Sequence, residues 1–127
     1  MKFGLFALNY GTCADPEAAV TVARHAEAAG FESVWTGEHV VLPDPAPSPR
    51  VFPPTLPFLD TTVALTLLAA HTTRIRVATG IIVLPLHNPV LLAKELASVD
   101  VVSGGRLTVG VAAGYMPAEF ASVGVPM

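Results

Sequence analysis

The chain has 127 residues, of which 52% are hydrophobic and 13% are charged, and its formal net charge is −3. This length and composition predict a single domain that is rich in core material. The apolar residues come in short runs broken by proline, glycine and aspartate, and no run approaches the roughly 20 residues of a membrane span. No basic cluster is present, which argues against a nucleic-acid partner. The one cysteine, Cys13, cannot form an internal disulfide, which is typical of a protein of the reducing cytoplasm.

The first part of the chain predicts a strand, a helix and a second strand. Residues 3–8 form an apolar run that favours a strand. Asp15 and Pro16 then offer an N-cap and a proline at the first helical position, and the helix they begin is expected to end near Gly30. A second apolar run at residues 33–36 predicts the next strand.

Residues 37–57 differ in composition from the rest of the chain, because they contain seven of its twelve prolines. We expect an irregular loop there, and long loops in compact domains are usually functional. Asp60 then caps a helix that runs through about Ala70. Residues 75–84 are rich in β-branched side chains and carry Gly80 in their middle, which predicts a long buried strand with a local irregularity at the glycine.

The last part of the chain repeats the alternation of helix and strand. Asn88 begins a third helix that ends at residues 103–105, residues 107–113 form a fourth strand, and a short helix follows at 118–123. Outside the proline-rich loop, the strands recur at about 30 residues, which is the length of a βαβ unit. The pattern predicts an α/β fold with a parallel sheet covered by helices. Both a doubly wound sheet and a (β/α)8 barrel fit this spacing.

Chemistry in either fold is expected where strands end at their carboxyl side. Glu38 and His39 follow the second strand, and a neutral imidazole at this position can move a proton or hydrogen-bond a ring carbonyl. The alternative is that His39 bonds loop backbone. His25 and His71 are expected to be structural, and His87 is expected not to face the site.

Other common signatures are missing. Residues 110–114 contain two glycines but not the G-x-G-x-x-G pattern, and no P-loop pattern occurs, which weakens the doubly wound dinucleotide hypothesis. No pair of histidines has metal-ligand spacing, so no metal is expected. Cys13 has no basic partner nearby in the sequence and is expected to be an inert thiol.

Several longer segments together resemble the luciferase-like monooxygenase superfamily. They are IIVLPLHNP at 81–89, LAKELA at 92–97, DVVSGGRL at 100–107, GVAAGYMPAEF at 110–120 and GVP at 124–126. The segment at 110–120 looks like the coenzyme F420-dependent subgroup, and Glu38-His39 after the second strand also matches. The resemblance covers essentially the whole chain.

The resemblance implies that residues 1–127 are the first four β/α units, and so the N-terminal half, of a single (β/α)8 TIM-barrel domain. It implies an oxidoreductase or monooxygenase that binds FMN or coenzyme F420 at the carboxyl ends of its strands and acts on a small organic substrate. His39 would be the active-site histidine. Cofactor contacts would come from Glu38, Thr79, Gly80, Ile81, Gly114 and Tyr115.

Two details of that implied site concern individual residues. The family carries a non-proline cis peptide behind the flavin ring, which would fall at Gly80–Ile81; we expect a cis peptide or a bulge there. Deazaflavin dehydrogenases often carry an acid just after the fourth strand, whereas Tyr115 stands at that position here. Tyr115 is therefore expected to cover the ring or to donate a hydrogen bond.

The chain is short for such a barrel, which takes about 250 residues and usually builds its phosphate site from loops after strands seven and eight. Four strands cannot close a ring, so we expect residues 1–127 alone to form a homo-oligomer or to be poorly soluble, and to bind cofactor weakly. Two other functions are considered: a non-catalytic fragment that acts only by self-association, and a metal-dependent hydrolase, for which ligands are lacking.

Overall fold

The computed structural model describes residues 1–46 and 52–127. The middle of the predicted proline-rich loop therefore lies outside the described residues. Within them, four parallel strands form one sheet in the order β1-β2-β3-β5, with the bounds Gly4–Phe6, Ser33–Thr36, Arg76–Thr79 and Leu107–Thr108. A doubly wound sheet reverses its strand order at a switch point. The order here follows the chain without reversal, which is the order of a barrel.

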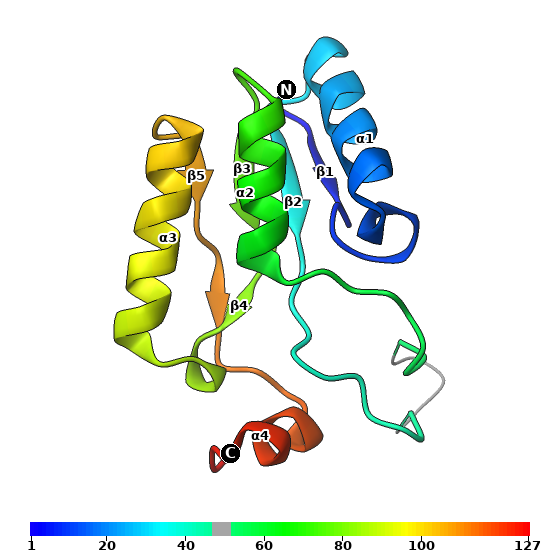
Figure 1. Cartoon of the computed structure of the whole chain (residues 1–127), viewed down its shortest axis with the longest axis vertical. Helices are drawn as coiled ribbons and strands as arrows, with labels where there is room; N and C mark the ends of the chain where they lie inside the picture. The colour runs from blue at the N-terminus through cyan, green and yellow to red at the C-terminus, as the bar shows by residue number, and fades with distance from the viewer. Residues whose placement is uncertain (47–51) are drawn as a thin grey trace.

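Among the described helices, α1 (Pro16–Ala28), α2 (Thr61–His71) and α3 (Pro89–Ser103) lie against one face of the sheet, whereas α4 (Pro117–Val123) lies beyond the strand ends (Figure 1). Each long helix begins at its predicted cap. The side chains of Asp15, Asp60 and Asn88 accept hydrogen bonds from backbone N–H groups of the first helical turn. None of the helices in the described ranges is long and apolar enough to cross a membrane.

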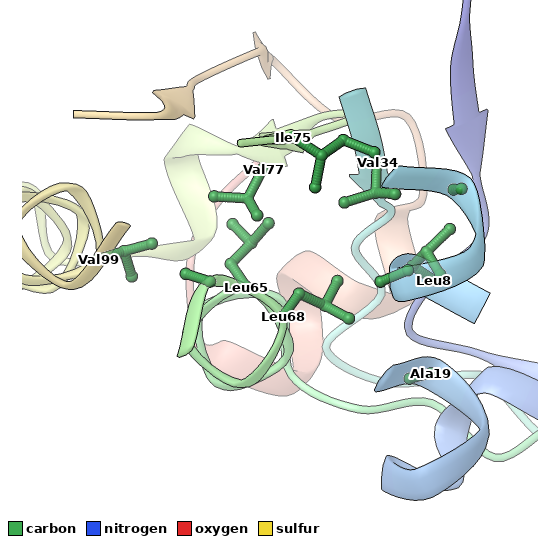
Figure 2. Packing of buried hydrophobic residues seen from close by; sticks show 11 residues of the cluster. Leu8, Ala19, Val34, Leu65, Leu68, Ile75, Val77 and Val99 are labelled. Carbon is green, nitrogen blue, oxygen red and sulfur yellow. The ribbon is translucent and has the colours of Figure 1, made fainter. Parts of the chain in front are cut away.

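The core lies between the helices and the sheet. Strand register places Leu5, Val34, Val77 and Leu107 side by side on the helix-facing side. Figure 2 shows Leu65 and Leu68 of α2 pointing toward the strand residues, with Ala19 of α1 and Val99 of α3 at either side. Burial of each large apolar side chain contributes about 1.5–3 kcal/mol. The helices therefore hold one face of the sheet, and the opposite face carries Phe6 and Trp35.

The third strand is interrupted at Gly80, as predicted. It ends as β3 at Thr79 and resumes as β4 (Ile82–Val83), which pairs with β6 (Val111–Ala112). A Cβ atom on Gly80 would lie 2.2 Å from Cε2 of Phe6 and 2.6 Å from the carbonyl oxygen of Thr36, so only glycine fits. The interruption therefore has a packing cause.

Of the two forms expected at Gly80–Ile81, a cis peptide or a bulge, the structure shows an irregular backbone and no cis peptide. The cis bond found in the described residues joins Asp44 to Pro45. At the interruption, the Thr79 hydroxyl takes over the missing ladder contacts: Oγ1 donates to Gly110 O at 2.8 Å and accepts from Gly110 N at 2.7 Å. Ile82 N then rejoins the ladder through Gly110 O, so the break is accommodated with trans peptides.

Two strand predictions need correction in length. The fourth strand, expected over residues 107–113, is divided into β5 and β6 at Gly110, where a Cβ atom would lie 2.7 Å from the Thr79 carbonyl oxygen. The first strand ends at Phe6 rather than at residue 8, because Ala7 has a φ of 82° and turns the chain.

The segment Ser103-Gly104-Gly105-Arg106 joins α3 to β5 and explains one of the sequence motifs. Gly104 ends the helix in the left-handed conformation, with a φ of 65°. The Arg106 guanidinium donates to the carbonyl oxygens of Ala69, Thr72, Ile75 and Ser103 and to the Thr72 hydroxyl. The motif therefore ties the C-terminal ends of α2 and α3 to the start of two strands.

Candidate active site

A pocket of about 140 Å³ lies at the carboxyl ends of the strands. In Figure 1 these ends, the long loop after β2 and α4 all lie at the same end of the molecule. The pocket is lined by residues that come from four separate strand ends, from the loop and from α4: Phe6, Tyr10, Gly37, Glu38, His39, Phe52, Phe58, Ile81, Val83, Tyr115 and Glu119.

Asn9 fixes the base of the long loop. Its side chain is buried, and its Nδ2 donates to the carbonyl oxygens of Gly37 at 2.8 Å and of Leu59 at 2.9 Å. Its Oδ1 accepts from Gly37 N at 2.9 Å. The Thr61 hydroxyl also donates to the Gly37 carbonyl. Both ends of the loop are thereby attached to the end of β1, so the residues that follow Gly37 start from a fixed point.

His39 is paired with a carboxylate from the far end of the chain. Its Nδ1 lies 3.2 Å from Oε1 of Glu119, and the same oxygen accepts from Val40 N at 2.9 Å. The side chains of His39 and Glu119 are only 11% and 4% exposed. The partner of this nitrogen is therefore a buried carboxylate and not loop backbone, so the alternative of a backbone-bonded His39 does not hold at Nδ1.

Glu38, the preceding residue, is also part of a Glu–His pair, but here the loop supplies the carboxylate and a later segment supplies the histidine. Its Oε1 lies 2.9 Å from Nε2 of His87, and its Oε2 accepts from Val83 N at 2.6 Å. His87 does not line the pocket, as expected, but it contacts the site through Glu38, a role that the sequence analysis did not foresee. Glu38 thereby ties the loop after β2 to the backbone of β4.

Aromatic rings enclose His39. Its ring meets those of Phe52, Phe58 and Tyr115 edge-on, with centroids 5.7, 5.8 and 6.3 Å away. Tyr10 stacks on Phe58 at 4.9 Å. Edge-to-face contacts of this kind are favourable and restrict ring rotation. The pocket is therefore apolar around one oriented histidine.

The structure brings together some of the predicted site residues and not others. Glu38, His39, Ile81 and Tyr115 line the pocket. Thr79 is buried beneath it and bonded to Gly110. At Gly114, which has a φ of 84°, a Cβ atom would meet Val83 and Phe120. Thr79, Gly80 and Gly114 thus shape the backbone around the pocket.

The roles of two side chains at the candidate site could not be predicted from the sequence. Asn9 reads as an ordinary loop residue, and Glu119 reads as an acid in the first turn of a helix, which the helix dipole alone accounts for. Only the fold shows that Glu119 reaches a histidine 80 residues away. A pairing of this range leaves no local signal in one sequence.

The remaining candidate groups have structural roles. The Nδ1 atoms of His25 and His71 bond the carbonyl oxygens of Thr21 and Leu67, as expected for structural histidines. Burial raises the pKa of the Cys13 thiol, which lowers its thiolate fraction. Across residues 1–46 and 52–127, no group of three or more His, Cys, Asp or Glu side chains could hold a metal ion.

The fold and the pocket define part of a parallel β/α barrel with its site at the carboxyl ends of the strands. The chain belongs to the luciferase-like monooxygenase family, whose sequence model matches residues 1–127. The four described strand units are the first part of a (β/α)8 TIM barrel.

Individual relatives support the same family. The chain is 36% identical over 134 residues to an uncharacterised protein of Mycobacterium tuberculosis, covering 99% of this chain and 46% of that protein. It is 33% identical over 102 residues to the oxygenase component of the flavin-dependent trigonelline monooxygenase of Acinetobacter baylyi, covering 80% and 25%. The coenzyme F420-dependent tetrahydromethanopterin reductase of Methanopyrus kandleri has a similar structure, with a TM-score of 0.71 at 26% identity over 98% of this chain and 30% of that one. The chain therefore spans less than half the length of these relatives.

Proposed function

We propose that the protein carrying residues 1–127 is a flavin- or coenzyme F420-dependent oxidoreductase or monooxygenase that acts on a small organic substrate. The observation that carries the proposal is His39, a histidine held by a buried carboxylate at the wall of an apolar pocket, at the strand ends where barrel enzymes place their chemistry. The flavin- and F420-dependent relatives support the same class of cofactor.

The residues of the pocket suit the redox ring of such a cofactor. Ile81, Val83 and Tyr115 offer apolar surface to a planar ring, and His39 offers one hydrogen-bonding nitrogen. The volume of about 140 Å³ is below the roughly 300–1,000 Å³ of small-molecule sites, so the pocket encloses only part of a ring. No Lys or Arg is among the described lining residues, so the pocket fits the ring and not the phosphate of FMN or F420.

When bound, the cofactor supplies or accepts the electron pair of the redox step. The chain itself supplies position and a proton carrier. His39 has one nitrogen engaged by Glu119, and its Nε2 gives or takes the proton. The rings of Phe52 and Phe58 pack edge-on against His39, and Ile81 and Tyr115 offer contacts to the cofactor ring.

The other residues of the proposed site hold the backbone around the pocket in position. Glu38 holds Val83 N and so fixes one wall of the pocket. Thr79, Gly80 and Gly114 maintain the interrupted backbone on which that wall depends. These residues contribute to cofactor binding through the position of the backbone.

The test is the variant His39→Ala in the protein as its gene encodes it. Turnover of a small organic substrate found by screening should fall by about 10²–10⁴-fold, which is the typical contribution of a general acid–base group. The free energy of unfolding should fall by about 1–3 kcal/mol, because the buried Glu119 carboxylate keeps Val40 N but loses its other partner. Unchanged turnover in a folded variant would contradict the proposal, and a large loss of stability would make His39 structural.

We also infer that residues 1–127 on their own self-associate. Phe6 is 52% exposed on the sheet face opposite the helices, and β1 and β5 are the two edges of the sheet. Open edges and exposed apolar side chains promote association. Size-exclusion chromatography with light scattering should give a dimer or larger species, or a precipitate, and a soluble monomer would contradict this inference.

A further inference from the structure

Glu38 and His39 are neighbours that take part in two crossed Glu–His pairs. Glu38 pairs with His87 from the segment after β4, and His39 pairs with Glu119 from α4. The two pairs differ in what they leave free. Glu38 accepts hydrogen bonds at both of its oxygens, whereas among the described residues His39 has a partner at Nδ1 only.

We propose that Glu119 is a positioning residue that holds His39 in the tautomer with the proton on Nδ1 and leaves the Nε2 lone pair available at the pocket. An ionised carboxylate can only accept hydrogen bonds, so the nitrogen that faces it carries the proton. In a neutral imidazole, the second nitrogen is then an acceptor. The catalytic consequence of this tautomer rests on the proposed function, but the tautomer itself does not.

The Glu119 carboxylate is held in place by the backbone N–H of Val40, the residue that follows His39. Its Oε1 accepts from Val40 N at 2.9 Å as well as facing Nδ1 of His39 at 3.2 Å. One oxygen atom thus fixes both the side chain of His39 and the peptide that follows it. A carboxylate with a single mobile contact would not orient the ring in this way.

The helix that carries Glu119 is docked rather than loose. Met116 and Phe120 flank the residue and are both buried, and Gly114 leaves room for the Phe120 ring. Ser122 Oγ donates to the Glu119 carbonyl at 2.7 Å. The carboxylate is therefore delivered to His39 by a packed element.

The rings around His39 make the orientation specific. Phe52, Phe58 and Tyr115 all meet it edge-on, so a ring flip would have to displace aromatic neighbours. Glu119 thus selects the nitrogen that carries the proton, and the aromatic rings oppose rotation of the imidazole. Together they define one tautomer in one orientation.

The experiment is ¹⁵N NMR of the histidine side chains in the protein as its gene encodes it, near neutral pH, without cofactor. The wild-type protein should show His39 with a protonated Nδ1 and an unprotonated Nε2. Glu119→Ala should shift His39 toward the Nε2-protonated form that imidazole prefers in water. Glu119→Gln should retain the wild-type pattern, because Val40 N holds the amide oxygen in the same place. His87→Ala, which removes the neighbouring Glu–His pair, should leave the pattern of His39 unchanged.

Two results would overturn the proposal: an Nε2-protonated His39 in the wild-type protein, or an unchanged tautomer in folded Glu119→Ala. The wild-type spectrum decides the matter even if the alanine variant does not fold. In a turnover assay, Glu119→Ala should lower kcat by about 10²-fold, at the lower end of general acid–base contributions, with little change in KM. If the tautomer behaves as expected but no flavin or F420 binds, the proposed function fails and the positioning role stands.

Discussion

Asn9 and Gly37 exchange two hydrogen bonds: Asn9 Nδ2 donates to Gly37 O at 2.8 Å, and Gly37 N donates to Asn9 Oδ1 at 2.9 Å. The Asn9 side chain therefore bonds both backbone groups of Gly37, as a neighbouring strand would, at the point where β2 ends. Because Glu38 and His39 follow directly, the position of both site residues depends on this buried amide.

Replacement of Asn9 by alanine should destabilise the protein. It leaves the N–H of Gly37 and the carbonyl of Leu59 without their partner, whereas the Gly37 carbonyl keeps the Thr61 hydroxyl. Each buried group left unpaired costs about 1–3 kcal/mol, so we expect a loss of at least about 2 kcal/mol in urea unfolding. Exposed Ser98→Ala, which removes a single bond to its own helix, is the control and should have an effect within about 0.5 kcal/mol. Equal stability of the two variants would contradict the role of Asn9.

Gly80→Ala tests the packing explanation of the strand break. The added Cβ would meet the Phe6 ring and the Thr36 carbonyl oxygen, and the carbonyl cannot move without displacing β2. Overpacking of this kind costs about 1–3 kcal/mol. Gly37→Ala is the matched control, since its Cβ would lie no closer than 3.3 Å to the same Phe6 ring. The free energy of unfolding should fall more for Gly80→Ala, and the reverse order would contradict the explanation.

The Arg106 contacts predict a large effect from a residue far from the site. Arg106→Ala removes donors to four carbonyl oxygens and one hydroxyl at the ends of α2 and α3. Thermal or urea unfolding should show a loss of about 2–4 kcal/mol. Arg24→Ala removes one exposed bond, to the carbonyl oxygen of His71, and should cost less than about 1 kcal/mol. A small effect of Arg106→Ala would show that this junction is not stabilising.

The Glu27 carboxyl makes the free energy of unfolding depend on pH. Burial raises the pKa of its carboxyl, but hydrogen bonds from the N–H groups of Ile75, Arg74 and Thr73, together with the charge of Arg74, outweigh this effect and leave the pKa below its ordinary value. A lowered folded-state pKa contributes stability that is present above the ordinary pKa and is lost as the pH falls through the folded-state value.

We therefore expect Glu27→Gln to be less stable than the wild-type protein at neutral pH, with the difference shrinking as the pH falls through the lowered pKa. Urea unfolding of both proteins between about pH 6 and about pH 3 measures this difference. A gap that stays constant over that range would contradict the linkage.

The helices of this fold could be predicted closely because their signals are local. Asp15, Asp60 and Asn88 each stand one residue before a helix and satisfy its first N–H groups. The breaks in the strands were harder to predict from the sequence. A glycine in a β-branched run indicated an irregularity at Gly80, but its form depends on Phe6 and Thr36, which are distant in the sequence.

The site could be predicted only in part, for the same reason. His39 stood out because it follows a strand, and the structure places it on the pocket wall. The partner that orients it, Glu119, and the residue that fixes its loop, Asn9, act across 80 and 28 residues. Such contacts are created by the packing of strands and of α4 in three dimensions and have no pattern along the chain.

In the proposed function, the strand-end pocket receives the ring of FMN or F420. This binding is tested most directly by titrating both cofactors into the protein as its gene encodes it, following cofactor fluorescence, and into folded Ile81→Arg, which fills the pocket. We expect saturable binding of one cofactor, weakened at least about 10-fold by Ile81→Arg and unchanged by Ser98→Ala on α3, where 10-fold corresponds to about 1.4 kcal/mol. Absence of saturable binding of either cofactor, or equal affinity in Ile81→Arg, would contradict it.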